Sequence, residues 1–259
     1  MTRSCSLAVA ALAMVLAGSM ATAANVTWDG SGDMTWYQPD STDWSGATYQ
    51  SGDTAEFLGA GLGGVVISGT VTPGAVVVNS AGDYVFSGGA IGGSTGLTKA
   101  GAGMLTLSSA SSFTGSVLVN EGVVKIGNMY AFGARNAAFG KVIVASGAAV
   151  ELNGVIDAGY GYTIAGSGVG GTGAIVNTGG GIGNGNLQTS NIRLADDATI
   201  GGTGNWALLA PGYGATTLDL AGHTLTKAGT NTFTIANATL TSGAIRIAGG
   251  TFTQYRRTH

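Results

Sequence analysis

Two glycine-rich stretches have the spacing of motifs that bind a dinucleotide or carry a serine nucleophile. Residues 59–64 match G-x-G-x-x-G, and residues 92–96 match the G-x-S-x-G nucleophile elbow. Both motifs must lead directly into a helix. The residues that follow, 65–67 (Val-Val-Ile) and 97–99 (Leu-Thr-Lys), are typical of strands. Because the chain holds 48 glycines among 259 residues, we interpret both matches as coincidental.

Few side chains are available for metal or thiol chemistry. The chain has two histidines, His223 and His259, and one cysteine, Cys5, so it contains no zinc-ligand pattern. Adjacent Asp196 and Asp197 would point to opposite faces of a strand, which is poor geometry for an acid–base pair. The sequence therefore predicts no catalytic residue, no cofactor and no bound metal.

Acidic and aromatic residues concentrate in residues 25–58. The acidic spacing fits no EF-hand loop. A calcium or sugar site is the functional alternative, but we interpret the segment as an end cap that closes the first layer of a repeat stack. Its members are Trp28, Trp36, Trp44, Tyr37, Tyr49, Phe57, Asp29, Asp33, Asp40, Asp43, Asp53 and Glu56.

Composition excludes several classes of protein. Charged residues make up 9% and hydrophobic residues 44%, which is too apolar for a disordered glycine-rich linker. The formal net charge of −3 offers no basic surface for nucleic acid. Residues 1–23 have the basic start, short apolar run and A-x-A site of a secretory signal peptide. That run is too short for a transmembrane helix, and no later stretch is long enough.

Short apolar runs that alternate with small or polar residues indicate strands throughout the rest of the chain. In residues 150–152, 218–220 and 245–247 a charged residue separates two apolar ones, which predicts one buried and one wet face. The expected core includes Leu105, Leu107, Val117, Val119, Val124 and Ile126. The turns are glycine-rich rather than the Asn-Gly or Asp-Gly turns of hairpins.

A repeated stretch decides between all-β architectures. Residues 97–101 (Leu-Thr-Lys-Ala-Gly) return as residues 225–229. Stacked repeats of this kind favour an all-β solenoid, a parallel β-helix with three short strands in each coil of roughly 22 residues. A β-sandwich is the fallback. The expected organisation is a signal peptide at 1–23, an N-terminal cap at 24–58, β-helix repeats at 59–252 and a C-terminal tail at 253–259.

Residues 97–107, followed by Phe113-Thr114-Gly115 and Glu121-Gly122-Val123, closely resemble the autotransporter-associated β-strand repeat. Trp28-Asp29-Gly30 resembles the usual start of such proteins. The resemblance implies a right-handed parallel β-helix, export across the inner membrane of a Gram-negative bacterium, and a place at the cell surface or in the medium. The repeat carries no catalytic residues.

Two functions follow from this reading. The first is an exported structural or adhesive passenger that contacts a surface glycan or a host or cell-surface protein. The alternative is a carbohydrate-active β-helix enzyme, similar to polysaccharide lyases and hydrolases, with a site assembled from Arg193, Asp196, Asp197, Asp219 and Arg246. At the C-terminal end, apolar Ile245 and Ile247 have little to cover them, so we expect fraying or end-to-end self-association there.

Overall fold

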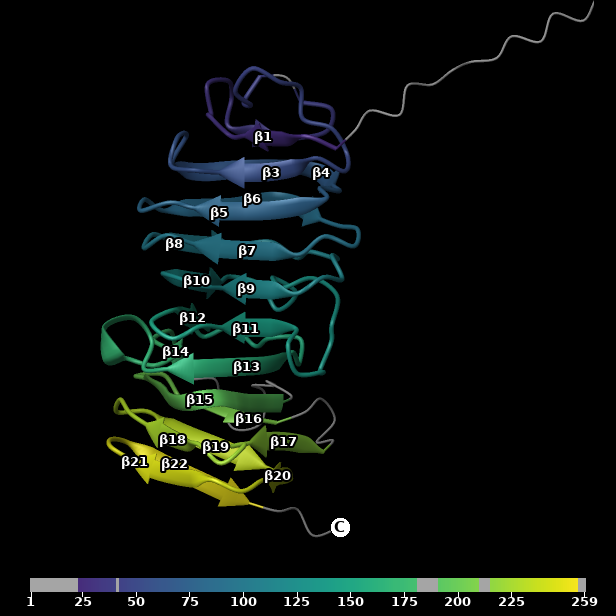
Figure 1. The fold of residues 1–259 in the computed structure, drawn as a ribbon. Helices are drawn as coiled ribbons and strands as arrows, with labels where there is room; N and C mark the ends of the chain where they lie inside the picture. Colours follow the sequence, from purple (N-terminus) through teal and green to yellow (C-terminus); the bar gives the residue numbers. More distant parts are fainter. Residues whose placement is uncertain (1–22, 41, 181–190, 210–214, 256–259) are drawn as a thin grey trace, which may run out of the picture.

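The structure is a computed structural model that describes residues 23–40, 42–180, 191–209 and 215–255. The predicted signal peptide lies almost wholly outside these residues. Figure 1 shows one elongated stack of short strands that wind from the N-terminal to the C-terminal end. Every pairing between these strands is parallel. The chain is therefore a parallel β-helix, and the predicted fold class is confirmed.

Two sides of the stack are continuous ladders, in which each strand lies on the strand of the preceding coil. The first side consists of β1 (Asn25–Thr27), β3 (Thr54–Phe57), β5 (Ala75–Asn79), β7 (Leu97–Ala100), β9 (Val117–Val119), β11 (Val142–Val144), β13 (Gly161–Gly166), the first half of β15 (Asn191–Gly202), β17 (Thr216–Asp219) and β20 (Ala238–Leu240). The second side consists of β2 (Thr35–Trp36), β4 (Gly63–Val71), β6 (Tyr84–Ile91), β8 (Met104–Leu107), β10 (Val123–Ile126), β12 (Ala149–Glu151), β14 (Ile175–Asn177), the second half of β15, β18 (Thr224–Lys227) and β21 (Ala244–Ile247).

The third side departs from the prediction of three strands in every coil. Among the described residues it forms a separate ladder only near the C-terminal end, from β16 (Trp206–Leu208), β19 (Thr232–Ala236) and β22 (Thr251–Tyr255). In the earlier coils, β4 and β6 pair briefly beyond a bulge, Thr70 with Ala90 and Val71 with Ile91, and the rest of this side is irregular chain. Coil length also varies on the first side, from 117 − 97 = 20 residues between Leu97 and Val117 to 192 − 162 = 30 between Tyr162 and Ile192. The variation in coil length therefore falls at the corners and on the third side, outside the two continuous ladders.

The six predicted core residues are all buried, with at most 4% of any of them exposed. They point into the stack because inward and outward side chains alternate along each strand. Glu151 is the exception to the expected wet face, since it is only 7% exposed. Its carboxylate accepts hydrogen bonds from the Asn153 N–H, the Thr178 N–H and the Thr178 hydroxyl. Burial of this outward carboxylate is thus compensated by hydrogen bonds from neighbouring residues of the chain.

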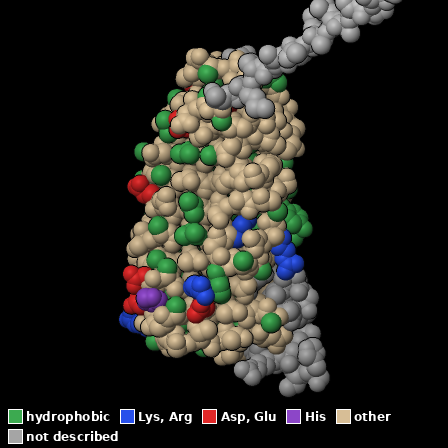
Figure 2. All heavy atoms as spheres, turned by 45° about the vertical axis from the view of Figure 1, so that its right-hand side comes forward, with side chains coloured by type: hydrophobic (Ala, Val, Ile, Leu, Met, Phe, Trp, Pro, Cys, Tyr) green, Lys and Arg blue, Asp and Glu red, His purple; other side chains and the backbone are tan. Residues whose placement is uncertain are grey.

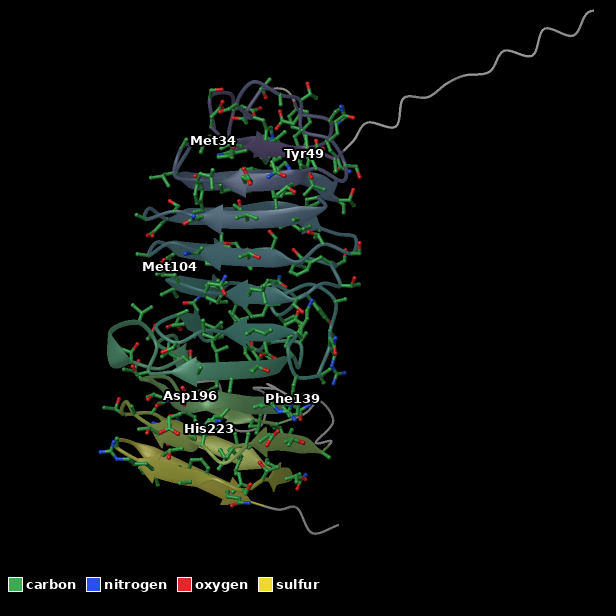
Figure 3. The ribbon with its side chains drawn as sticks, viewed as in Figure 1. Met34, Tyr49, Met104, Phe139, Asp196 and His223 are labelled. Carbon is green, nitrogen blue, oxygen red and sulfur yellow. The ribbon has the colours of Figure 1, made fainter. Side chains whose placement is uncertain are left out.

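Aromatic rings pack against one another at the N-terminal end of the stack. Trp28, Trp36, Trp44, Tyr49 and Phe57 are all buried. The ring centroids of Trp28 and Trp44 lie 5.3 Å apart edge to face, and those of Trp44 and Tyr49 lie 4.8 Å apart in a stack. Figure 3 labels Tyr49 within this first layer. Such pairs add stability beyond the apolar area that they bury.

Two aspartates of residues 25–58 accept hydrogen bonds from backbone N–H groups and a tryptophan indole of the same segment. The Asp43 carboxylate accepts hydrogen bonds from the N–H groups of Gly32 and Met34, and Asp40 accepts one from Trp44 Nε1 at 3.0 Å. Both aspartates are fully buried. These carboxylates hold the irregular loops of residues 29–49 against the aromatic rings, which is a structural role.

The last described coil is far more exposed than the coils above it. Leu240 is 42% exposed and Ile247 is 56% exposed. Within the described residues, β20, β21 and β22 each pair with a strand on one side only. The described part of the chain also contains no helix with the length and apolar character that a membrane span requires.

Candidate functional site

The lysine of the repeated Leu-Thr-Lys-Ala-Gly stretch lies inside the β-helix. Lys99 is 1% exposed, at the corner where β7 of the first side turns into β8 of the second. Its Nζ donates hydrogen bonds to the carbonyls of Ala100 and Gly101, and to that of Glu121 in the next coil at 3.2 Å. The ammonium therefore joins two successive corners from within.

Lys227 repeats this arrangement at another corner. It is fully buried, and its Nζ donates hydrogen bonds to the carbonyls of Ala228 at 2.6 Å and of Gly249 at 3.3 Å. Each lysine reaches the next coil 22 residues further along the chain. A third buried lysine, Lys141, donates to the carbonyls of Phe113 and Gly115, and its Nζ lies 4.6 Å from the centre of the Phe113 ring.

Glycines make room for these ammonium groups. Gly122 and Gly250 follow the acceptor carbonyls at the corners of the next coils, with φ of 71° and 65°. A Cβ at Gly122 would lie 2.8 Å from Lys99 Nζ, and one at Gly250 would lie 2.9 Å from Lys227 Nζ. Only glycine combines this backbone conformation with that space. The Gly residues and the Lys of the repeat thus form one structural unit.

Burial lowers the pKa of all three lysines, because removal from water disfavours the charged form. The effect is largest for Lys141, whose pKa falls to about 8. The pKa of Lys99 and of Lys227 is also lowered by burial, and the nearby carboxylates of Glu121 and Asp83 partly offset the shift at Lys99. Sequence reasoning assigned no role to these lysines. The position of Lys directly before Ala-Gly in both copies was the signal that it missed.

The residues of the proposed enzyme alternative gather around β15. Asp196 and Asp197 lie where this strand bends from the first side of the stack to the second, and His223 lies in the turn between β17 and β18. His223 Nδ1 is 3.8 Å from Asp196 Oδ1 and 3.9 Å from Asp197 Oδ1. Both carboxylates therefore reach the same histidine, and the expectation of opposite faces was wrong because the strand turns a corner here. Figure 3 labels Asp196 and His223 on neighbouring coils.

A second charged pair joins β15 to β17. Arg193 Nε donates to Asp219 Oδ2 at 2.6 Å, because the two residues are register partners on β15 and β17. The guanidinium also covers the Phe139 ring, 4.3 Å from its centre. Hydrogen bonds from Thr241 and Arg193 lower the pKa of the Asp219 carboxyl, which therefore stays ionised.

These charges form an open surface rather than a catalytic cleft. The side chains of Asp196 and Asp197 are 77% and 71% exposed. Arg246 is exposed on β21 and is not part of either pair. Figure 2 shows acidic, basic and histidine side chains together over the lower coils of this face. We call Arg193, Asp196, Asp197, Asp219 and His223 the charged corner, a polar surface on a chain with few charges.

A groove of about 610 Å³ lies elsewhere, on the outward face of the second side. It runs from β8 across β10, β12 and β14 to the corner after β18. An excursion between β13 and β14, which includes the 3-10 turn η1 (Val169–Gly171), forms one wall and projects from the stack in Figure 1. The lining consists of Met104, Val123, Lys125, Ala149, Glu151, Val169, Gly171, Thr172, Val176, Thr178, Gly202, Thr203, Ala228, Gly229 and Thr230.

Comparison with known proteins identifies the repeated stretch. The passenger-associated transport repeat matches residues 97–126 and 225–253, which include Lys99 and Lys227. The adhesin BmaC autotransporter of Brucella suis biovar 1 (strain 1330) is 29% identical over 197 residues. The chain therefore carries two copies of an autotransporter-associated repeat.

The aligned residues of this repeat protein amount to 67% of its chain and 5% of the Brucella adhesin. The repeat protein therefore corresponds to a small part of that relative. No solved structure gives a significant match. Both matched stretches contain a buried lysine, corner glycines and the alternating apolar strands described above.

Proposed function

We propose that the chain is an adhesive segment of an exported bacterial passenger, in which the β-helix is a scaffold and carries no catalytic site. The observation that carries this proposal is that the side chains characteristic of the repeat point into the β-helix. The side chains of Lys99 and Lys227 point inward, beside their corner glycines, and their ammonium groups bond each coil to the next. This leaves the outward face available for function, and the relative from Brucella suis is named an adhesin.

The proposed location is the bacterial surface or the medium, reached through the signal peptide at residues 1–23. The proposed partner is a surface glycan or a protein on another cell, rather than nucleic acid, since the chain has a net charge of −3. The charged corner is the first contact surface to test. Exposed charges steer and orient partners more than they add affinity, which suits weak contacts repeated along a long surface.

Adhesion of beads coated with the mature chain, starting at Ala24, tests the proposal. We expect saturable binding to mammalian cells that soluble chain competes away. The double variant D196N/D197N should weaken binding several-fold if the charged corner makes the contact. The control D33N/E121Q removes two carboxylates elsewhere, and its binding should match that of the parent.

Two results would contradict this function. Coated beads that bind cells and arrayed glycans no better than bare beads would remove the adhesive role. Depolymerisation of an acidic polysaccharide by the parent chain, lost in D196N/D197N, would restore the enzyme alternative instead.

A further inference from the structure

The groove on the second side is the place where outward side chains are most deeply buried. In β12 and β14 both faces are buried, whereas β8 and β10 alternate between buried and more exposed residues. Outward Ala149 is 2% exposed and outward Val176 is 6% exposed. The excursion between β13 and β14 flanks them at Val169 and Thr172. The groove is therefore a walled channel on an otherwise open face.

The shape of the groove fits a single extended chain. Its ends, at Met104 of β8 and Ala228 after β18, are separated by five strand spacings in the ladder. Five spacings correspond to roughly 24 Å along the axis of the stack, and the volume then gives a mean cross-section of roughly 25 Å². The volume also lies within the usual range for small-molecule sites. An occupant would lie along the axis and across the strands.

The lining disfavours occupants with many polar groups. The strands beneath the groove have their N–H and C=O groups engaged in the ladder, so a peptide laid across them would leave its own backbone unpaired. Two of the four threonines are already engaged, since Thr172 donates to the Val169 carbonyl and Thr178 to Glu151. An alkyl chain has no such requirement and would bury apolar area against Val123, Ala149 and Val176.

One charged group in the groove has hydrogen-bonding capacity left. Within the described residues, no carboxylate lies within 4.0 Å of the Lys125 ammonium. Its neighbour in register, Glu151, is already bound to Asn153 and Thr178. From these contacts we infer that the groove binds a long-chain fatty acid, with its carboxylate at Lys125 and its alkyl chain running towards Ala228.

Titration of the full mature chain with a fluorescent long-chain fatty acid, with palmitate as competitor, tests this inference. We expect saturable binding of one molecule per chain. Affinity should rise with the length of the competing acid, by up to about fourfold for each buried CH₂, until the groove is full. The matched long-chain alcohol should bind about threefold more weakly, since an exposed ion pair adds little.

Variants locate the site. Ala149→Leu fills the groove, and Val123→Asp places a charge in it, so each should weaken binding at least about tenfold. Val77→Asp is the matched control, because Val77 points outward from β5 on the first side, away from the groove. Lys125→Gln should remove the difference between acid and alcohol and leave the affinity for the alcohol unchanged. Thermal melting of each variant separates loss of binding from loss of fold.

The inference is overturned if the parent shows no saturable binding of the fatty acid. It is equally overturned if folded Val123→Asp and Val77→Asp lose affinity to the same extent, or if a peptide or glycan competes as well as palmitate. Adhesion of coated beads is a separate readout, so failure here leaves the adhesive function untouched.

Discussion

Both copies of the passenger repeat place a lysine at a corner, but the two corners join different sides of the β-helix. In residues 97–126 the Leu-Thr-Lys strand is β7 on the first side, and the strand after the corner is β8 on the second. In residues 225–253 the same strand is β18 on the second side, followed by β19 on the third. The repeat therefore encodes a corner between two strands, and not a particular face.

The copies also differ in what lies beyond them. Residues 97–126 have a coil stacked before them and another after them, so their inward apolar side chains are buried. Residues 225–253 include the last described coil, where Ile247 is exposed although its strand pairs in register with β18. A repeat gains most of its burial from its neighbours, which is the expected behaviour of a solenoid.

The largest effect expected from this difference concerns two inward-facing apolar residues on the second side, one in each copy. Leu107→Asp should destabilise the chain by about 4 kcal/mol, because it buries an unpaired charge. Ile247→Asp, at a position that is 56% exposed, should cost less than about 1 kcal/mol. Chemical denaturation measures both. Equal midpoints for the two variants would show that the copies do not differ in burial.

The next effect concerns the corner lysines. Lys99→Ala should cost about 3 kcal/mol, since it leaves the carbonyls of Ala100, Gly101 and Glu121 without their donor and opens a cavity. Lys227→Ala should cost less in global stability, because its coils lie near the end of the described stack. Hydrogen exchange should localise that loss to residues 225–253. A larger global cost at Lys227 than at Lys99 would reverse the proposed order.

A smaller difference is expected without any substitution. Strands β20 and β21 have partners on one side only among the described residues. Their amides should exchange at least roughly tenfold faster than those of residues 104–126 in a dilute monomer. Equal protection would contradict fraying. Protection that appears only at high protein concentration would support end-to-end self-association.

The smallest expected effect is at an outward residue of the first copy. Lys125→Ala should change the free energy of unfolding by less than about 0.5 kcal/mol, since its ammonium has no ion-pair partner in the described residues. Thermal melting of Lys125→Ala and of Lys99→Ala measures the difference between an outward and an inward lysine of the same repeat. A cost at Lys125 as large as that at Lys99 would mean that the inward and outward registers are misassigned.

The sequence by itself determined the repeat, the strands and the aromatic end. Alternation of apolar and small residues specifies which face of a strand is buried, and this pattern is local. The core positions Leu105, Leu107, Val117, Val119, Val124 and Ile126 followed from it directly. The aromatic segment at the N-terminal end could also be recognised from the sequence, because tryptophans concentrated at one end of a repeat array are typical of an end cap.

Only the tertiary structure decided where the charges go. The sequence of an alternating strand does not distinguish a lysine whose ammonium is exposed to solvent from one whose ammonium is buried at a corner. For Lys99 the acceptors at Ala100 and Gly101 are local, but Glu121 comes from the next coil. Asp196, Asp197 and His223 meet because β15 bends and the next coil stacks on it. Coil length and the bend set these contacts, and neither is encoded in the residues that make them.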